Sequence, residues 1–334
     1  MLPRSQNFTS LEMRSLITLA AGLVASLSSI IPGAAAQCLN EVGQFNSNLR
    51  TMSSNTTWFI IPIPKEAAQA AVDASYLGQG LTMLDVPNDP SLFPEGWPAG
   101  SQPVLVNTGL TDDIRLSALQ IDGGLLQGQI YVTYVGRRGS STPLGAATNG
   151  YIAGQNGPLP NGLVPAIASP LLFGGNPLRL GQFQPRGDAY QQNGNDIFGA
   201  RVAWAIVPNP VSGPGVYPNA FDMIFRTASS SRYTDKTFKS LINQPIILPS
   251  GMCQRNTYYF GNATAGPVFR NGNVTLGPGA SGSNPLSSDF QQASPDGSGF
   301  YGDVDGYSAC AQNVGFDPQD CEEAAMTVDP VALQ

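Results

Sequence analysis

Apolar and polar side chains alternate along several short stretches of this 334-residue chain. The alternation is clearest over residues 129–135 and 201–206, and a period of two places successive side chains on opposite faces of a β-strand. Residues 57–62 form an apolar, β-branched and aromatic run that also favours a strand. Further strand candidates cover residues 103–107, 114–121, 128–135, 198–207 and 221–227.

Helical patterns are few. Only residues 65–77, which begin directly after Pro64, and residues 234–242 resemble helices. The chain holds 38 glycines and 28 prolines, and these interrupt the strand candidates at short intervals. The pattern predicts an all-β or β-dominated α+β fold with one or two short helices, built as a closed barrel or as a sandwich.

The first 36 residues have the pattern of a secretory signal peptide. Arg4 and Arg14 precede an apolar run at 16–31, and the small residues 34–36 supply a cleavage site. A membrane anchor is the alternative, but the run is shorter than the ~20 residues of a spanning helix. We predict a secreted protein that is cleaved after Ala36 and has no membrane association afterwards. Initiation at Met1 or at Met13 gives the same mature chain.

The rest of the chain divides into three parts by composition. Residues 37–276 hold the strand candidates and predict one barrel domain. Residues 277–302 are rich in Gly, Ser, Pro and Asp, which is typical of a flexible linker. We expect residues 303–334 to form a small C-terminal cap or tail.

Covalent modifications follow from the predicted export. Four cysteines fit two disulfides, and of the three possible pairings we favour 310 with 321 and 38 with 253. Three sequons predict glycosylation. The residues are Cys38, Cys253, Cys310 and Cys321 for the disulfides, and Asn55, Asn262 and Asn273 for the glycans.

The chain contains no histidine, which excludes Ser-His-Asp triads, Cys-His dyads and His-ligated metal sites. Its formal net charge is −7 and only 12% of its residues are charged, without clustered Lys and Arg, so we predict no nucleic-acid partner. The acidic run at 303–305 departs from the EF-hand template, and no Cys-x-x-Cys pair occurs. We predict neither a cofactor nor a metal.

Several segments resemble a known family. WFIIPIPKEAA at residues 58–68, LFPEG at 92–96, residues 103–115 and the strand at 128–137 resemble the N-terminal half of the acetoacetate decarboxylase superfamily. The resemblance spans residues 55–230 and implies a closed β-barrel around a small-molecule cavity. The segments at 240–245 and 253–260 also look like parts of secreted proteins of filamentous fungi.

One departure from that family matters most. Its decarboxylases use a strand lysine that forms a Schiff base with a β-keto acid. This chain has only Lys65, Lys236 and Lys239, and none lies between residues 66 and 235. We expect Lys236 and Lys239 to lie on a solvated helix face, so the sequence leaves open whether the protein is an enzyme.

Five side chains are candidate site residues, each with a structural alternative. A carboxylate and a guanidinium at a strand entrance can orient a keto group, but they also form surface ion pairs. Arginines within apolar strands can face a cavity or bond a nearby acid such as Asp222. A strand tyrosine can donate to an enolate or simply pack; the period of two predicts that Tyr131 and Tyr134 face opposite sides. The candidates are Asp112, Arg115, Tyr131, Arg201 and Arg226.

Two functions fit these observations. The first is a secreted barrel protein that handles a small keto or polyketide-derived molecule, in fungal secondary metabolism, without the family's Schiff-base lysine. The second is a non-catalytic extracellular glycoprotein that binds a ligand or associates with the cell wall. A cavity lined by Arg with Asp or Tyr would favour the first, and a barrel filled with Leu, Val and Phe the second. The oligomeric state stays open.

Overall fold

Nine strands close into a barrel in the computed structural model, which describes residues 38–116, 119–121, 123–155, 178–204, 220–261, 266–277 and 286–334. Each neighbouring pair of strands is hydrogen-bonded, and the pairing of β5 with β6 completes the ring. All pairs are antiparallel except β6 with β7. The predicted closed barrel is therefore confirmed. In ring order the strands are β1 (Arg50–Pro64), β3 (Ser101–Leu116), β5 (Leu125–Gly136), β6 (Leu144–Gly154), β7 (Arg179–Gln184), β9 (Ile197–Trp204), β10 (Phe221–Thr227), β14 (Val268–Leu276) and β15 (Phe300–Gly315).

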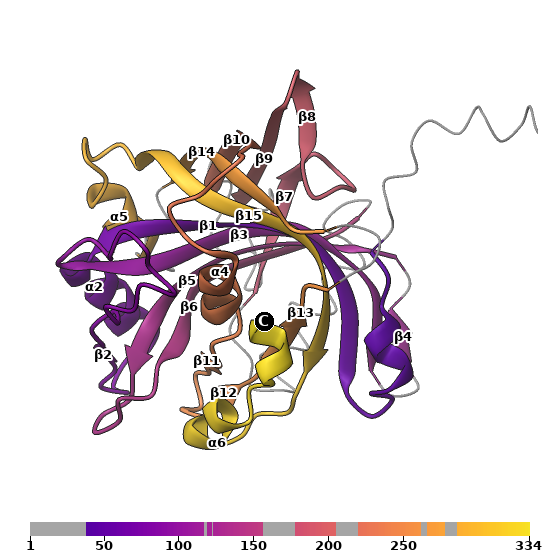
Figure 1. Ribbon diagram of the computed structural model, residues 1–334, viewed down its shortest axis with the longest axis horizontal. Coiled ribbons are helices and arrows are strands. Elements are labelled where there is room, and N and C mark those ends of the chain that lie inside the picture. Colours follow the sequence, from indigo (N-terminus) through magenta and orange to yellow (C-terminus); the bar gives the residue numbers. More distant parts are fainter. Residues whose placement is uncertain are drawn as a thin grey trace, which may run out of the picture. The chain divides into compact units, whose positions relative to one another are not determined.

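Six short strands extend this ring. β2 pairs with β5, β4 with β3 and β8 with β9, whereas β11 pairs with β6, β12 with β11, and β13 with β15. Only Arg255 separates β12 from β13, so these three strands lead from β6 back to β15 (Figure 1). Their bounds are β2 (Thr82–Met83), β4 (Leu119–Ile121), β8 (Gln191–Gly194), β11 (Ile246–Ile247), β12 (Cys253–Gln254) and β13 (Asn256–Tyr259).

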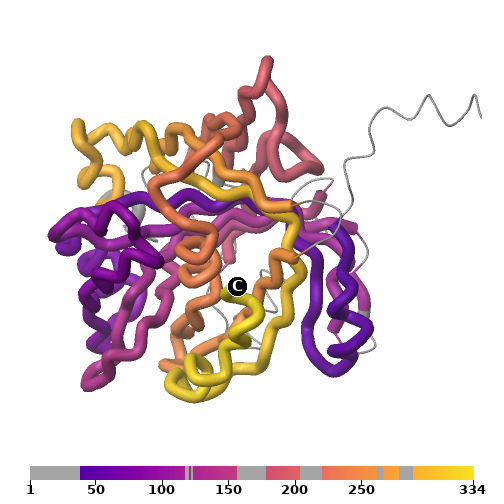
Figure 2. The backbone as a smooth tube through the Cα atoms, viewed as in Figure 1, coloured from indigo at the N-terminus to yellow at the C-terminus, as the bar shows by residue number. Residues whose placement is uncertain are grey.

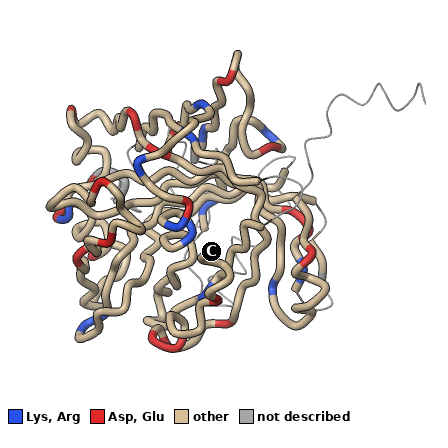
Figure 3. Tube along the Cα trace, in the orientation of Figure 1, with Lys and Arg blue, Asp and Glu red and all other residues tan. Residues whose placement is uncertain are grey.

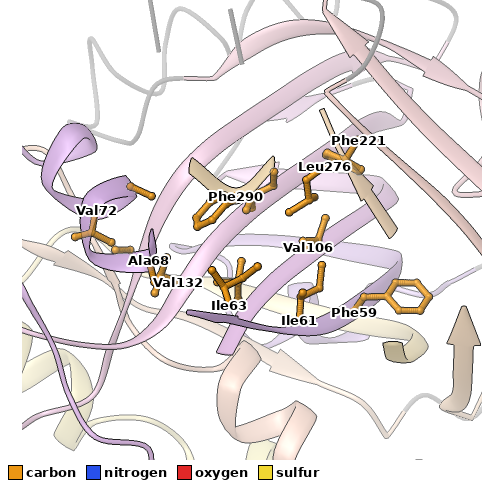
Figure 4. Packing of buried hydrophobic residues seen from close by; sticks show 14 of the residues in the cluster. Phe59, Ile61, Ile63, Ala68, Val72, Val106, Val132, Phe221, Leu276 and Phe290 are labelled. Carbon is orange, nitrogen blue, oxygen red and sulfur yellow. The ribbon is translucent and has the colours of Figure 1, made fainter. Parts of the chain in front are cut away.

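The inner face of the barrel is filled by apolar side chains, and every one of the nine strands contributes to this cluster. In β1 alternate residues such as Phe59, Ile61 and Ile63 point inward, while Trp58 and Ile60 point outward into a second cluster. Figure 4 shows Ile63 and Val106 among their neighbours in the inner core. Alternation along β1, which the sequence predicted only as an apolar run, thus separates two apolar clusters on opposite faces of the strand.

Two helices cover one end of the barrel. α2 (Lys65–Ser75) follows Pro64 and α5 (Leu286–Gln292) contacts α2, β14 and β6. Val72 of α2 and Phe290 of α5 are buried in the inner core (Figure 4). α4 (Asp235–Ile242) packs on the outer cluster instead. The predicted helices at 65–77 and 234–242 correspond to α2 and α4. The remaining elements are α6 (Cys321–Met326) and the 3-10 turns η1 (Glu41–Gln44) and η2 (Pro330–Leu333).

The structure differs from the prediction after residue 276. The expected linker at 277–302 contains α5, and the expected cap at 303–334 begins inside β15, which lies between β14 and β1 in the ring. Figure 2 shows the indigo β1 and the yellow β15, from opposite ends of the described chain, side by side. The barrel therefore needs residues up to 315. Small residues suit this strand, because Gly306 lies directly against the Phe59 ring.

All four cysteines form disulfides, but the favoured pairing was wrong. The bonds join Cys38 to Cys310 and Cys253 to Cys321. Cys310 lies within β15, and five extended residues carry the chain roughly 17 Å beyond it before the strand ends. A short loop from 310 to 321 is therefore not available, and each cysteine instead meets one that is distant in sequence.

Some predictions lie outside the described residues, namely the signal peptide at 1–36 and the sequon at Asn262. Asn273 is exposed on β14, and Asn55 is half-buried within β1. Glycosylation of these two remains a prediction. Within the described ranges no helix is long and apolar enough to cross a membrane. Acidic and basic positions are interspersed along the tube in Figure 3.

Candidate ligand-binding pocket

Helix α4 positions two charged side chains on the outer side of the barrel. Its first turn is fixed by a capping box, in which the side chains of Thr234 and Thr237 each accept a hydrogen bond from the other's backbone N–H. Phe238 and Leu241 face the outer cluster beside Trp58 of β1. Asp235 and Lys239, one helical turn apart, share a face of the helix that lies next to Tyr307, itself a residue of this cluster.

A pocket of about 490 Å³ opens beside these two residues. We call it the Lys239 pocket. β13, β14, β15 and η2 supply its other walls. Four aromatic residues line it, together with the charged pair and several small or aliphatic groups. Its lining residues are Asp235, Lys239, Tyr259, Phe260, Gly261, Pro267, Phe269, Tyr307, Val331, Ala332 and Gln334.

The polar end of the pocket is a connected set of hydrogen bonds. The Lys239 Nζ lies 2.5 Å from Asp235 Oδ2 and also donates to the backbone oxygen of Gln334. Tyr307 Oη donates to the other carboxylate oxygen of Asp235. Burial, and then the neighbouring Asp235, raise the pKa of Tyr307, so its hydroxyl stays protonated and continues to donate at neutral pH.

The prediction that Lys239 lies on a solvated helix face was wrong. The Lys239 side chain is only 12% exposed, whereas Lys236, three residues earlier on the same helix, is exposed. Lys65 also lies at the surface, where its Nζ is 2.8 Å from Asp85 Oδ1. Lys239 is paired with a carboxylate, and an ammonium held in this way has no free electron pair with which to attack a carbonyl.

Aromatic rings form the apolar walls of the pocket. Tyr307 stacks on Phe238 with ring centroids 4.9 Å apart and an interplanar angle of 11°. Phe260 and Phe269 lie with their ring centroids 5.7 and 5.9 Å from that of Tyr307. Such walls favour contact with a flat, largely apolar molecule.

None of the five predicted site residues lines this pocket, and four of them are partly or fully exposed. Arg115 forms a partly exposed ion pair with Asp113, at 2.6 Å, and the Asp112 side chain accepts from the Asp113 N–H in the same strand, β3. Arg201 Nε lies 3.2 Å from Asp222 Oδ1 on the outer face. This is the structural ion pair that the sequence analysis gave as the alternative to a role in a cavity. Arg226 is exposed. The structure therefore does not bring these four side chains together.

Tyr131, the fifth candidate, is buried in the outer cluster. Burial raises the pKa of its hydroxyl. Tyr134 belongs to the same cluster, which contradicts the prediction of opposite faces. A register shift between Val132 and Val135 and a positive φ of 54° at Tyr134 interrupt the period of two.

The sequence analysis missed the residues that the pocket brings together. Asp235 and Lys239 have the i, i+4 spacing of a helical ion pair, and this signal was present in the predicted helix. Tyr307 carried no such signal, because its segment was expected to form a cap. Among the described residues, no group of three His, Cys, Asp or Glu side chains is placed to hold a metal ion.

The described residues thus form a nine-stranded closed barrel, with helices over one end and the Lys239 pocket on its outer side.

A scan against protein-family models and a search of curated proteins find no match. Among solved structures the chain is similar to "Enduracididine biosynthesis enzyme MppR complexed with the condensation product of pyruvate and imidazole 4-carboxaldehyde", with 12% identity, a TM-score of 0.44, and 80% of this chain and 86% of that chain covered.

Two further structures are similar. MppR with HEPES buffer bound has 11% identity and a TM-score of 0.42, with 80% of this chain and 85% of that chain covered. An acetoacetate decarboxylase-like enzyme from Sphingomonas wittichii RW1 has 7% identity and a TM-score of 0.44, with 82% and 92% covered. The name of this last structure contains the name of the family that segments within residues 55–230 resemble. The barrel itself rests on this chain's own strand pairing, and no site residue is transferred from these proteins.

Proposed function

We propose that this protein is a secreted barrel protein that binds a small keto or polyketide-derived molecule in the Lys239 pocket, without forming a Schiff base. The observation that carries the proposal is the combination of aromatic walls with one polar end in a pocket of about 490 Å³. That volume lies within the range of small-molecule sites.

The polar end suits a carbonyl or enol oxygen. A lysine ammonium has three N–H donors, and here two of them point to Asp235 and Gln334. The third is available to an oxygen of the ligand. Tyr307 keeps Asp235 hydrogen-bonded, which fixes the carboxylate that orients Lys239. The ligand oxygen would thus meet a charged donor held in place before binding.

Export is supported by the signal-peptide pattern at 1–36, by the sequons and by the two disulfides, because disulfides persist in oxidising compartments. A role in fungal secondary metabolism is part of the same proposal, supported by the residues that resemble secreted fungal proteins.

The test is calorimetric titration of the protein with an aromatic β-keto compound and with its analogue that lacks the keto oxygen. We expect the keto compound to bind at least about tenfold more tightly, because a hydrogen bond to a charged group contributes ~1.5–3 kcal/mol. Lys239→Met should remove this preference. Lys236→Met, on the same helix but exposed, is the matched control and should leave it unchanged.

Borohydride reduction in the presence of a β-keto acid separates binding from imine chemistry. We expect no covalent adduct by mass spectrometry. An adduct on Lys239 would contradict the proposal, and so would a Lys239→Met variant that keeps the preference for the keto compound.

A second candidate is a non-catalytic, wall-associated glycoprotein. The filled inner face of the barrel favours it, because Leu, Val, Ile and Phe side chains occupy that space. Under this function neither the keto compound nor its analogue would bind, and the purified protein would instead be retained on isolated cell-wall polysaccharide.

A further inference from the structure

Arg270 lies on the inner face of β14, in line with the buried residues Val274 and Leu276. Leu276 is near the barrel end that α5 covers, since its backbone N–H bonds Gly299. Arg270 is six residues away along an extended strand, about 20 Å toward the opposite end. The whole residue is only 5% exposed, so a permanent positive charge sits inside this end of the barrel.

The guanidinium of Arg270 is bonded to neutral hydroxyls. Nε donates to Ser308 Oγ at 2.9 Å, one terminal nitrogen to Thr227 Oγ1 at 2.7 Å, and the other to Tyr190 Oη at 3.5 Å. Ser308 is itself fixed by Thr57, with their hydroxyl oxygens 2.7 Å apart. Among the ion pairs of the described residues, none involves Arg270. A guanidinium has five N–H groups, so two of them make no hydrogen bond within the described part of the chain.

Aromatic rings surround the same group. Its Cζ lies 4.7 Å from the ring centroid of Phe198 and 5.6 Å from those of Tyr190 and Phe225. Tyr190 and Phe198 are only partly buried, and Thr227 is exposed. The guanidinium therefore lies just inside the barrel wall, next to side chains that solvent reaches.

A buried cation without an acid partner costs free energy that ring and hydroxyl contacts only partly offset. An anion that accepts the two remaining N–H groups would supply the missing charge. We propose that Arg270 is the centre of a second binding site, which takes the carboxylate of a small aromatic acid. The single positive charge matches one carboxylate, and the flanking rings match a planar apolar body. This site is separate from the Lys239 pocket and does not depend on the function proposed for it.

The experiment measures binding of benzoate and of its neutral isostere benzamide to the purified full chain by isothermal titration. We expect benzoate to bind and benzamide to bind at least tenfold more weakly. Arg270→Met should weaken benzoate binding by about tenfold to hundredfold, as expected for loss of a charge-assisted pair of hydrogen bonds. Arg226→Met removes an exposed arginine from the neighbouring strand β10, and should leave benzoate binding unchanged.

A second variant covers the case in which Arg270→Met does not fold. Phe198→Leu keeps the charge and removes one flanking ring, so benzoate should bind more weakly while acetate, which has no ring, binds as to the wild type. The proposal is overturned if benzamide binds as tightly as benzoate. It is also overturned if neither Arg270→Met nor Phe198→Leu weakens benzoate binding, or if benzoate binding falls equally in Arg226→Met.

Discussion

Gly306 shows how one residue limits the packing of the whole barrel. It lies opposite Phe59 in the register of β1 and β15, and a Cβ at this position would be 2.5–2.8 Å from three atoms of the Phe59 ring. Real Cβ atoms do not approach so closely, and Phe59 is fully buried in the inner core. The missing side chain is therefore what allows Phe59 to fill the barrel next to β15.

Gly306→Ala should lower the free energy of unfolding by about 1–3 kcal/mol, because overpacking a filled core forces side chains or backbone to shift. Urea unfolding followed by circular dichroism measures this change. Gly266→Ala is the control, since a Cβ there meets nothing within 4 Å. Equal stability of the two variants would show that Phe59 can move aside without cost.

At the scale of elements, helix α4 holds both the outer cluster and the charged end of the Lys239 pocket. Thr234→Ala removes the hydroxyl that accepts from the Thr237 N–H at 3.1 Å. We expect a loss of about 1 kcal/mol in unfolding free energy, the usual cost of losing an N-cap. The affinity for a keto ligand should also fall, because Asp235 follows the cap directly.

Thr234→Ser keeps the capping oxygen and is the control for that variant. It should retain both the stability and the affinity in the same urea and calorimetric titrations. If Thr234→Ala unfolds like Thr234→Ser, the capping box does not determine the position of α4.

The elements that the sequence predicted best are those whose pattern is local. β1 and α2 are recognisable because an apolar run, Pro64 and an alanine-rich segment follow one another. β15 was missed because Asp303, Gly306 and Ser308 make its sequence polar and flexible in composition. Its apolar environment comes from β1 and β14, which lie far away in the chain.

Site prediction failed for the same physical reason. Arg201 and Arg226 are arginines in apolar strands, and the pattern does not reveal which face of a barrel is the inner one. Arg270, which does face inward, is on β14, in a segment that was not predicted as a strand. The disulfide pairing likewise depends on how β15 is placed, not on sequence spacing.

For the whole molecule, the unusual composition predicts an unusual dependence of stability on pH. The chain has no histidine, and all four cysteines are in disulfides. No side chain of ordinary pKa therefore titrates between about pH 6 and 9. Above that range, burial raises the pKa of seven of the eleven tyrosines, to about 12 for three of them. The seven are Tyr131, Tyr134, Tyr233, Tyr258, Tyr259, Tyr301 and Tyr307.

The sign of the effect follows from proton linkage. Between pH 10 and 12 the unfolded chain loses tyrosine protons that the folded chain keeps, so the unfolded state binds fewer protons and stability falls as pH rises. We expect the free energy of unfolding in urea to be constant from pH 6 to 9 and to fall steadily from pH 10 upward.

Tyr259→Phe should flatten that fall, because it removes one tyrosine whose pKa is raised in the folded protein. Absorbance at 295 nm should show tyrosinate appearing together with unfolding. A stability that stays constant to pH 12, or tyrosines that ionise near pH 10 in the folded protein, would mean that these hydroxyls are in contact with solvent.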